Sequence, residues 1–181
     1  MTSQFTAELR IPKERIAVLI GTSGSIKKQI ESNTKTSIKI DSSEGFVFIN
    51  GDDALNIYSA KEMIRAIARG FNPEIANLLL KQDFGFELLE IKDFIKSKND
   101  LKRLKGRIIG KDGKSRRVIE DLTESCISVY GKTVGIIGEI ETLFLARKAI
   151  EMLLKGSTHA NVYKWLERQR SKLRRKEFTE L

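Results

Sequence analysis

The fold of this chain is decided by a short loop that occurs twice, as Gly21-Thr22-Ser23-Gly24 and, 89 residues later, as Gly110-Lys111-Asp112-Gly113. Each copy follows an apolar stretch and opens a segment in which an isoleucine, Ile30 or Ile119, comes six residues after the last glycine. Each segment continues with a Glu-x-x-Thr pattern and then a short strand-like run. A pattern that recurs at a fixed spacing predicts two copies of one structural unit.

The residues around each loop predict the same order of elements in both halves: strand, helix, loop, helix, strand, strand and a long helix. In the first half we expect strands at residues 5–11, 37–41 and 46–50 and helices at residues 15–20, 25–34 and 52–69. In the second half we expect strands at residues 86–94, 126–129 and 133–137 and helices at residues 101–109, 115–122 and 139–154. Pro73 suits the first turn of a short connecting helix that reaches Lys81. A basic helix at residues 160–176 has no counterpart in the first half.

The composition predicts a polyanionic partner. The chain has 33 basic and 24 acidic residues, a net charge of +9 and a pI of about 9.7. This balance alone does not separate nucleic acid from a membrane surface. However, no apolar run approaches the roughly 20 residues that a membrane-spanning helix needs, so we expect no membrane association. A single cysteine excludes an internal disulfide and fits a reducing compartment, and the N-terminus lacks the apolar core of a signal peptide. We therefore expect a cytoplasmic protein.

The element order, with a Gly-x-x-Gly loop between two helices, resembles a type I KH domain in each half. The resemblance implies an α+β fold class: two tandem type I KH domains (βααββα), with three-stranded sheets packed on helices, plus a C-terminal basic helix. We expect the first KH domain at residues 1–71, a helical connector at residues 72–83, the second KH domain at residues 84–156 and the basic helix at residues 157–181.

The loops are the candidate RNA-binding sites. Glycine has no Cβ and adopts positive φ, so a sugar-phosphate backbone can approach the loop and the N-terminus of the helix behind it. By resemblance, each KH domain holds about four nucleotides of single-stranded RNA against an apolar groove. The expected RNA-binding residues are Gly21, Thr22, Ser23, Gly24, Lys27, Lys28, Ile30, Ile38, Arg107, Gly110, Lys111, Asp112, Gly113, Lys114, Arg116, Arg117, Ile119 and Ile127.

The two loops differ in charge. Thr22 and Ser23 are neutral, whereas the second loop and its helices carry Arg107, Lys111 and Lys114 together with Arg116 and Arg117. Because phosphate contacts supply much of the affinity for nucleic acid, we expect the second domain to dominate binding strength. The first domain would add register and sequence preference.

The second half narrows the resemblance to one family. Residues 86–93, 106–114 and 133–138, followed by a basic C-terminus, are similar to the archaeal form of the Partner-of-Nob-One family, whose members are small-subunit ribosome assembly factors. The resemblance implies binding to single-stranded RNA at the 3′ end of the small-subunit (16S) rRNA precursor and assistance in its maturation. It also implies cooperation with the endonuclease that makes the 3′ cut and with the rRNA dimethyltransferase.

Three other classes of function remain open from the residues: an enzyme, a different nucleic-acid-binding regulator, and an interaction scaffold whose basic C-terminal helix binds an acidic protein. An enzyme is disfavoured, because the chain has one histidine, His159, and one cysteine, Cys126, which falls on an expected strand. We expect no catalytic residues, no metal and no cofactor. The alternative is a tandem KH regulator that binds mRNA or single-stranded DNA, since Gly-x-x-Gly loops contact backbone and bases more than the 2′-hydroxyl.

Overall fold

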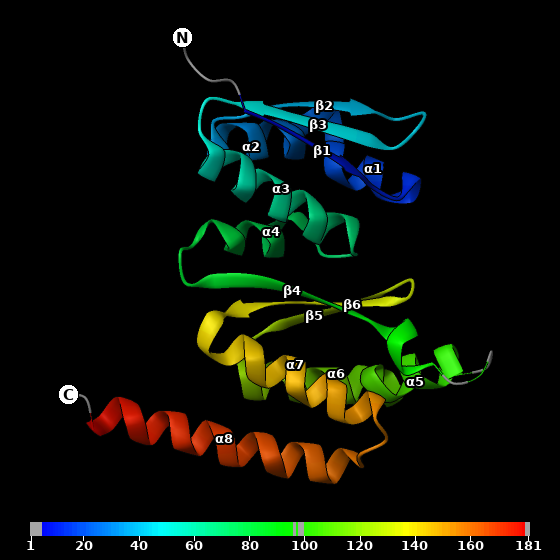
Figure 1. The fold of residues 1–181 in the computed structure, drawn as a ribbon, viewed down its shortest axis with the longest axis vertical. Helices are drawn as coiled ribbons and strands as arrows, with labels where there is room; N and C mark the ends of the chain where they lie inside the picture. The colour runs from blue at the N-terminus through cyan, green and yellow to red at the C-terminus, as the bar shows by residue number, and fades with distance from the viewer. Residues whose placement is uncertain (1–4, 96, 98–99, 180–181) are drawn as a thin grey trace. The chain divides into compact units, whose positions relative to one another are not determined.

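The protein forms two compact units, residues 1–82 and residues 83–181. The computed structural model describes residues 5–95, 97 and 100–179. Figure 1 shows that a three-stranded antiparallel sheet packs on helices in each unit. No helix within the described residues is long and apolar enough to cross a membrane.

The first unit has the predicted βααββα order, followed by a connecting segment. Its elements are β1 (Phe5–Arg10), α1 (Lys13–Ile20), the 3-10 turn η1 (Thr22–Gly24), α2 (Ser25–Thr34), β2 (Ser37–Asp41), β3 (Phe46–Gly51), α3 (Ala54–Ala68), α4 (Pro73–Ala76) and η2 (Asn77–Leu80). The sheet has the order β1-β3-β2, with Leu9 and Ile40 both opposite Val47 on the central strand.

The long helix α3 forms because its apolar residues recur at helical spacing and face the sheet. The Asp53 carboxylate accepts a hydrogen bond from the Leu55 N–H at 3.1 Å and caps the first turn. Ala60, Ile64 and Ile67 are fully buried three or four residues apart, as expected for the core side of an amphipathic helix. This core holds α1 and α2, and therefore the loop between them, against the sheet.

The second unit repeats this order and ends in an additional helix. Its elements are β4 (Phe84–Glu90), η3 (Ile91–Phe94), α5 (Asp100–Ile109), η4 (Lys111–Gly113), α6 (Lys114–Thr123), β5 (Cys126–Tyr130), β6 (Thr133–Glu139), α7 (Ile140–Leu154) and α8 (His159–Thr179). The sheet order β4-β6-β5 is equivalent to that of the first unit. The fold class predicted from the sequence is therefore confirmed, including the C-terminal helix.

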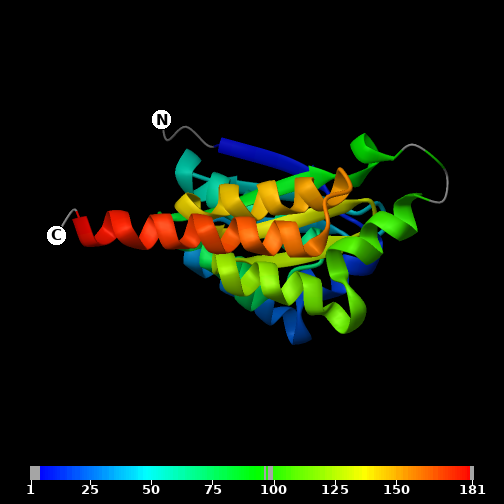
Figure 2. The ribbon, with the colours of Figure 1, turned by 90° about the horizontal axis from the view of Figure 1, so that it is seen from below.

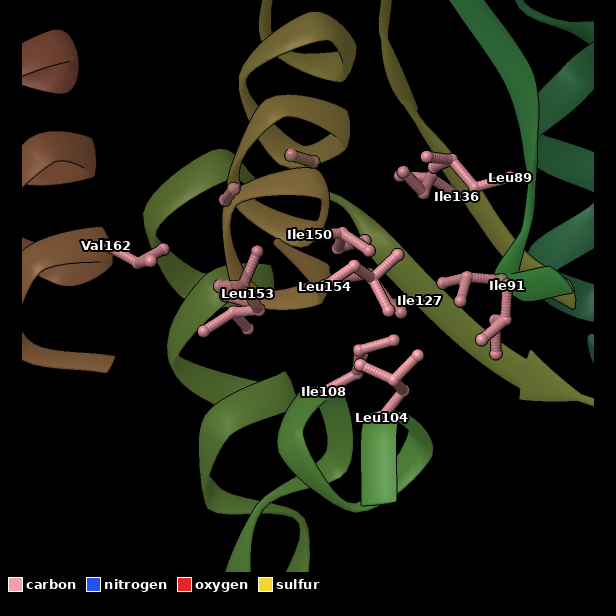
Figure 3. Close-up of a cluster of buried hydrophobic side chains, with 14 of the residues drawn as sticks. Leu89, Ile91, Leu104, Ile108, Ile127, Ile136, Ile150, Leu153, Leu154 and Val162 are labelled. Atoms are coloured by element: carbon pink, nitrogen blue, oxygen red, sulfur yellow. The ribbon is translucent and has the colours of Figure 1, made fainter. Parts of the chain in front are cut away.

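The core of the second unit extends to the C-terminal helix. Figure 3 shows Leu104 and Ile108 of α5 pointing toward Ile127 and Leu154, and Val162 of α8 pointing toward α7. Val162 and Leu166, the latter outside the labelled set, are at most 1% exposed. Figure 2 shows α8 running beside α6 and α7, against which it packs. The basic helix is thus an integral part of the second unit.

Most element boundaries differ from the prediction by one to three residues, and two segments differ in structure. The strand expected at residues 86–94 instead spans Phe84–Glu90: the Ile91 N–H makes one more bond of the ladder, to the Lys132 carbonyl at 2.9 Å, and the chain then turns into η3. The single helix expected up to Lys81 instead tightens from α4 into the 3-10 helix η2. Ala76 in this segment is fully buried, so the segment packs in the first unit, as its apolar residues predicted.

Candidate nucleic-acid interface

The two Gly-x-x-Gly loops have the same backbone conformation. Gly21 and Gly110 have φ/ψ of 72°/177° and 71°/177°, and Gly24 and Gly113 have 78°/15° and 76°/11°. In both loops the last glycine N–H donates to the first glycine carbonyl at 3.3 Å. The residue before the last glycine is left-handed in each loop, although it is not glycine. The repeat seen in the sequence is therefore a repeat of backbone geometry.

The first and last glycines of each loop serve different purposes. A Cβ on Gly110 would lie 2.6 Å from the Ser115 Cβ, and one on Gly21 would lie 2.5 Å from the Ile26 Cγ1. The first glycine is therefore required by the protein itself. A Cβ on Gly24 or Gly113 would have no neighbour closer than 4.0 Å or 3.7 Å, respectively. The last glycine is required only for its positive φ, and the space beside it is open to a ligand.

The helix behind each loop begins without a side-chain cap. Neither α2 nor α6 has a side-chain hydrogen bond to its first turn, so its first backbone N–H groups and its helix dipole face the loop. At the start of α6 the Ser115 Oγ and the Arg116 Nε are also buried without a hydrogen-bond partner within the described residues. The Arg116 Nε lies 3.5 Å from the Glu120 Oε2, an ion-pair distance without hydrogen-bond alignment. The uncapped backbone N–H groups suit an anion at the loop.

The cations of the second loop surround a hollow in its surface. The hollow is lined by Lys111, Asp112, Lys114, Arg117, Val118 and Asp121. Arg117 donates to the Asp112 carbonyl and braces the left-handed residue of the loop. Lys111 and Lys114 are exposed. The equivalent loop of the first unit has only hydroxyl side chains, with Lys28 close to the last glycine.

One predicted RNA-binding residue is used for packing. The Arg107 Nε donates to the Leu153 carbonyl at 3.0 Å and one terminal nitrogen donates to the Ser157 carbonyl at 2.5 Å. Its guanidinium thus ties α5 to the last turn of α7 and to the segment that follows it. Arg15 does the same in the first unit, donating to the Ile67 and Phe71 carbonyls at 2.8 and 2.7 Å. The two arginines occupy different turns of their helices, which hides the equivalence in the sequence.

The four predicted isoleucines belong to the two cores. Ile30, Ile38, Ile119 and Ile127 are at most 4% exposed, so in this structure they offer almost no surface to a base. Apolar surface beside the loops is nevertheless accessible, because five apolar residues of the flanking helices are partly exposed: Val18, Ile20, Ile26, Ile109 and Val118.

The repeated glutamate fastens the second helix of each unit to its edge strand. The Glu31 Oε1 accepts the Ile38 N–H, and the Glu120 Oε1 accepts the Ile127 N–H, both at 2.7 Å. The threonine of the same pattern bonds back to its helix, with Thr34 and Thr123 each donating to a carbonyl four residues earlier at 2.7 Å. The Glu-x-x-Thr pattern is thus a structural clasp behind the loop, a role that its spacing alone did not indicate.

The clasp also bears on the basic residue at the third position after each loop. Lys27 and Arg116 lie 3.6 and 3.5 Å from the clasp glutamates Glu31 and Glu120. Burial raises the pKa of the Glu120 carboxyl, with the Ile127 hydrogen bond and the charge of Arg116 opposing that rise. Both cations therefore stand beside a carboxylate, and each has less charge to offer a ligand than Lys111 or Lys114 has.

Cys126 does not have the character of a nucleophile. Burial raises the pKa of its thiol, and the charge of Glu120 raises it further. The thiolate is the reactive form, so this cysteine stays protonated at neutral pH. This agrees with its interpretation as a small, partly buried strand residue.

Comparisons with known proteins match both halves. Residues 85–171 match the family model described as eukaryotic type KH-domain (KH-domain type I), and residues 6–66 match the model of the KH domain. The KH domain-containing protein MJ0443 of Methanocaldococcus jannaschii is 49% identical over 174 residues, which are 94% of this chain and 76% of that protein. RNA-binding protein pno-1 of Caenorhabditis elegans is 33% identical over 64% of this chain, which spans only 43% of that longer protein.

A solved structure is similar over nearly the whole chain. It is the crystal structure of an a/eIF2alpha-aDim2p-rRNA complex from Pyrococcus horikoshii. The matched chain is 43% identical with a TM-score of 0.88, and the match covers 93% of this chain and 96% of that one. At this identity and coverage, the likeness extends through both units.

Proposed function

The chain belongs to the Dim2, or Partner-of-Nob-One, family of RNA-binding rRNA-processing proteins, and we propose that it binds single-stranded RNA at the 3′ end of the small-subunit rRNA precursor and assists its maturation. Family members are RNA-binding factors and not enzymes, in agreement with the expectation from the sequence that the chain is not an enzyme.

The second loop is the observation that carries this proposal. Its last glycine leaves open space, α6 presents uncapped backbone N–H groups, and Lys111 and Lys114 stand exposed beside them. A phosphate placed there would accept hydrogen bonds from the helix N-terminus and neutralise the lysines. The adjacent partly exposed Ile109 and Val118 offer apolar surface to an unstacked base.

The first loop contributes less binding energy in this proposal. Its backbone offers the same space and the same uncapped helix, but its two central residues are hydroxyl side chains. Backbone N–H groups and hydroxyls position a nucleic acid without supplying the counterion release that drives affinity. The first unit would therefore set register while the second unit supplies most of the strength.

The proposed partners follow from the family and from the solved complex. We expect the chain to act with the endonuclease that cuts the 3′ end of the small-subunit rRNA and with the rRNA dimethyltransferase. The rRNA complex with a/eIF2alpha from P. horikoshii makes the equivalent translation factor a further candidate.

Crosslinking in cells of the source, followed by sequencing of the bound RNA, tests this function. Reads concentrated at the 3′ end of the small-subunit rRNA are the expected result, and the crosslinked nucleotides would identify the bases held. Reads spread over many mRNAs would overturn the rRNA assignment and favour the regulator alternative. A parallel titration of the purified protein with the identified RNA and its DNA counterpart would distinguish RNA from single-stranded DNA as the ligand.

A further inference from the structure

The C-terminal helix α8 has one face that is fully engaged with the second unit. Val162 and Leu166 enter its core. Farther along the helix, Arg170 donates to the Glu124 carboxylate at the end of α6 at 3.2 Å. Arg170 and Leu173 also line a hollow with residues from the ends of α6 and α7. This face accounts for the attachment of the helix.

The opposite face carries a stripe of exposed cations, Lys164, Arg168 and Lys172, which we name the basic stripe. The three residues are four positions apart, so they lie along one side of the helix and span about 12 Å at 1.5 Å per residue. None of the three has an ion pair to another residue of the described part of the chain. Glu167 is the one acidic residue in the sequence from 159 to 175, against six lysines and arginines. The charges of Lys164, Arg168 and Lys172 are therefore not used in ion pairs that hold the fold together.

The chemistry of the basic stripe suits a phosphate backbone and not unpaired bases. Recognition of a single strand needs an aromatic platform or a groove on which bases stack. Among the side chains of α8 that the structure describes, the aromatic residues Tyr163 and Trp165 instead pack against the core of the second unit. A row of cations along a helix favours contact with backbone phosphates, which a duplex presents along a regular and rigid path.

We propose that the basic stripe binds the phosphates of an RNA duplex that adjoins the single strand held by the loop of the second unit. This inference rests on the proposed function, because it extends the RNA footprint of the same unit. The α8 helix packs along α6, and α6 begins at the Gly-x-x-Gly loop (Figure 2). The second unit thus presents a loop that would bind a single strand and a row of cations that would bind the adjoining duplex. Linking two such sites raises affinity through effective concentration.

Titration of two RNAs with the full chain tests the basic stripe. One RNA is the single strand alone, and the other carries the same single strand next to a hairpin stem. The test variant is Lys164→Gln/Lys172→Gln. The matched control, Lys132→Gln/Lys148→Gln, also removes two lysines that are exposed in the second unit. We expect the native chain to bind the junction RNA more tightly than the single strand. The test variant should lose about tenfold on the junction RNA and nothing on the single strand, with a salt slope that falls by about two.

The outcomes separate this inference from the proposed function. Loss of junction affinity in the test variant but not in the control supports the basic stripe. Equal behaviour of the two variants, or a native chain without preference for the junction RNA, overturns it while leaving single-strand binding intact. If the native chain fails to bind the single strand, the proposed function fails. The basic stripe is then judged on an isolated hairpin, where equal binding by the test variant and the native chain overturns it.

Discussion

The loops at Gly21–Gly24 and Gly110–Gly113 differ by only a few degrees in the φ and ψ of their glycines, yet only the second carries charged side chains, Lys111 and Asp112, and has Lys114 beside it. Their shape comes from the first glycine, which fits against the following helix, and from two left-handed residues. The first requirement does not involve the central side chains, and the left-handed central residue is a serine in one loop and an aspartate in the other; all four central residues are exposed. The shape of the loop and its attraction for phosphate are therefore independent properties. Substitutions that change one of the two properties at a time test this independence.

The largest effect is expected for the first glycine. Gly110→Ala should destabilise the second unit by about 3 kcal/mol, because it combines a clash with Ser115 and a backbone conformation almost restricted to glycine. Gly113→Ala should cost about 1–2 kcal/mol, because it meets only the strain of a left-handed residue. Denaturant unfolding followed by the fluorescence of Trp165 reports on this unit. Equal losses in the two variants would contradict the separate roles of the glycines.

The next effect is on RNA affinity and compares the two loops with the same change. Lys111→Asp in the second unit and Thr22→Asp/Ser23→Asp in the first both create a Gly-Asp-Asp-Gly loop and both change the charge by two. Asp112 already adopts the left-handed conformation, so the aspartates fit both backbones. We expect about a hundredfold loss for the second unit and about tenfold for the first in a titration with the crosslinked RNA. A larger loss from the first unit would reverse the proposed division of roles.

A third substitution distinguishes packing from RNA binding. Arg107→Ala should destabilise the second unit by about 2 kcal/mol, because it leaves two carbonyls at the end of α7 without a charged donor. Arg107→Lys should restore little of this, since a lysine lacks the planar fork that reaches both carbonyls. RNA affinity, measured under conditions where both variants are folded, should stay near that of the native chain. A large loss of affinity without loss of stability would return Arg107 to the RNA-binding residues.

The smallest effect concerns the clasp of the second unit. Burial raises the pKa of Glu120, so the folded state holds its proton more tightly than the unfolded state does. This group therefore adds stability as the pH falls through its raised pKa, and it opposes folding relative to a neutral group above that pH. Glu120→Gln keeps an oxygen for the Ile127 N–H and removes this titration. Compared with the variant, the native chain should gain stability between pH 7 and pH 4, measured by denaturant unfolding. An unchanged difference would exclude the buried carboxyl as the cause.

The order of elements and the position of both loops could be predicted because they depend on local patterns. Gly21 and Gly110 end helices, and the spacing of Ile64 and Ile67 identifies the core face of a long helix. These signals act within a few residues of each other, so a reading of the sequence detects them. The family resemblance rested on the same repeated patterns, which the comparisons confirm.

The roles of several site residues could not be predicted, because they depend on contacts distant in sequence. Arg107 reaches carbonyls 46 and 50 residues away, and Glu120 binds a strand residue seven positions on. In the sequence, a basic residue beside a glycine loop indicates phosphate binding, whether its side chain contacts a ligand or hydrogen-bonds within the protein. For the same reason Ile30 and Ile119 fitted a groove as well as a core, and only the packed structure separates the two.

The clasp glutamates Glu31 and Glu120 also affect the exposed edges of the two sheets. The strands β2 and β5 lie at sheet edges, where unpaired backbone groups invite a strand of another molecule to join. On each of these edges one such donor, the N–H of Ile38 or Ile127, is already occupied by a carboxylate from the same unit. The charge and bulk of that side chain prevent an incoming strand from forming a hydrogen bond at this position. The glutamates that anchor α2 and α6 thereby also help to keep copies of the protein from joining edge to edge.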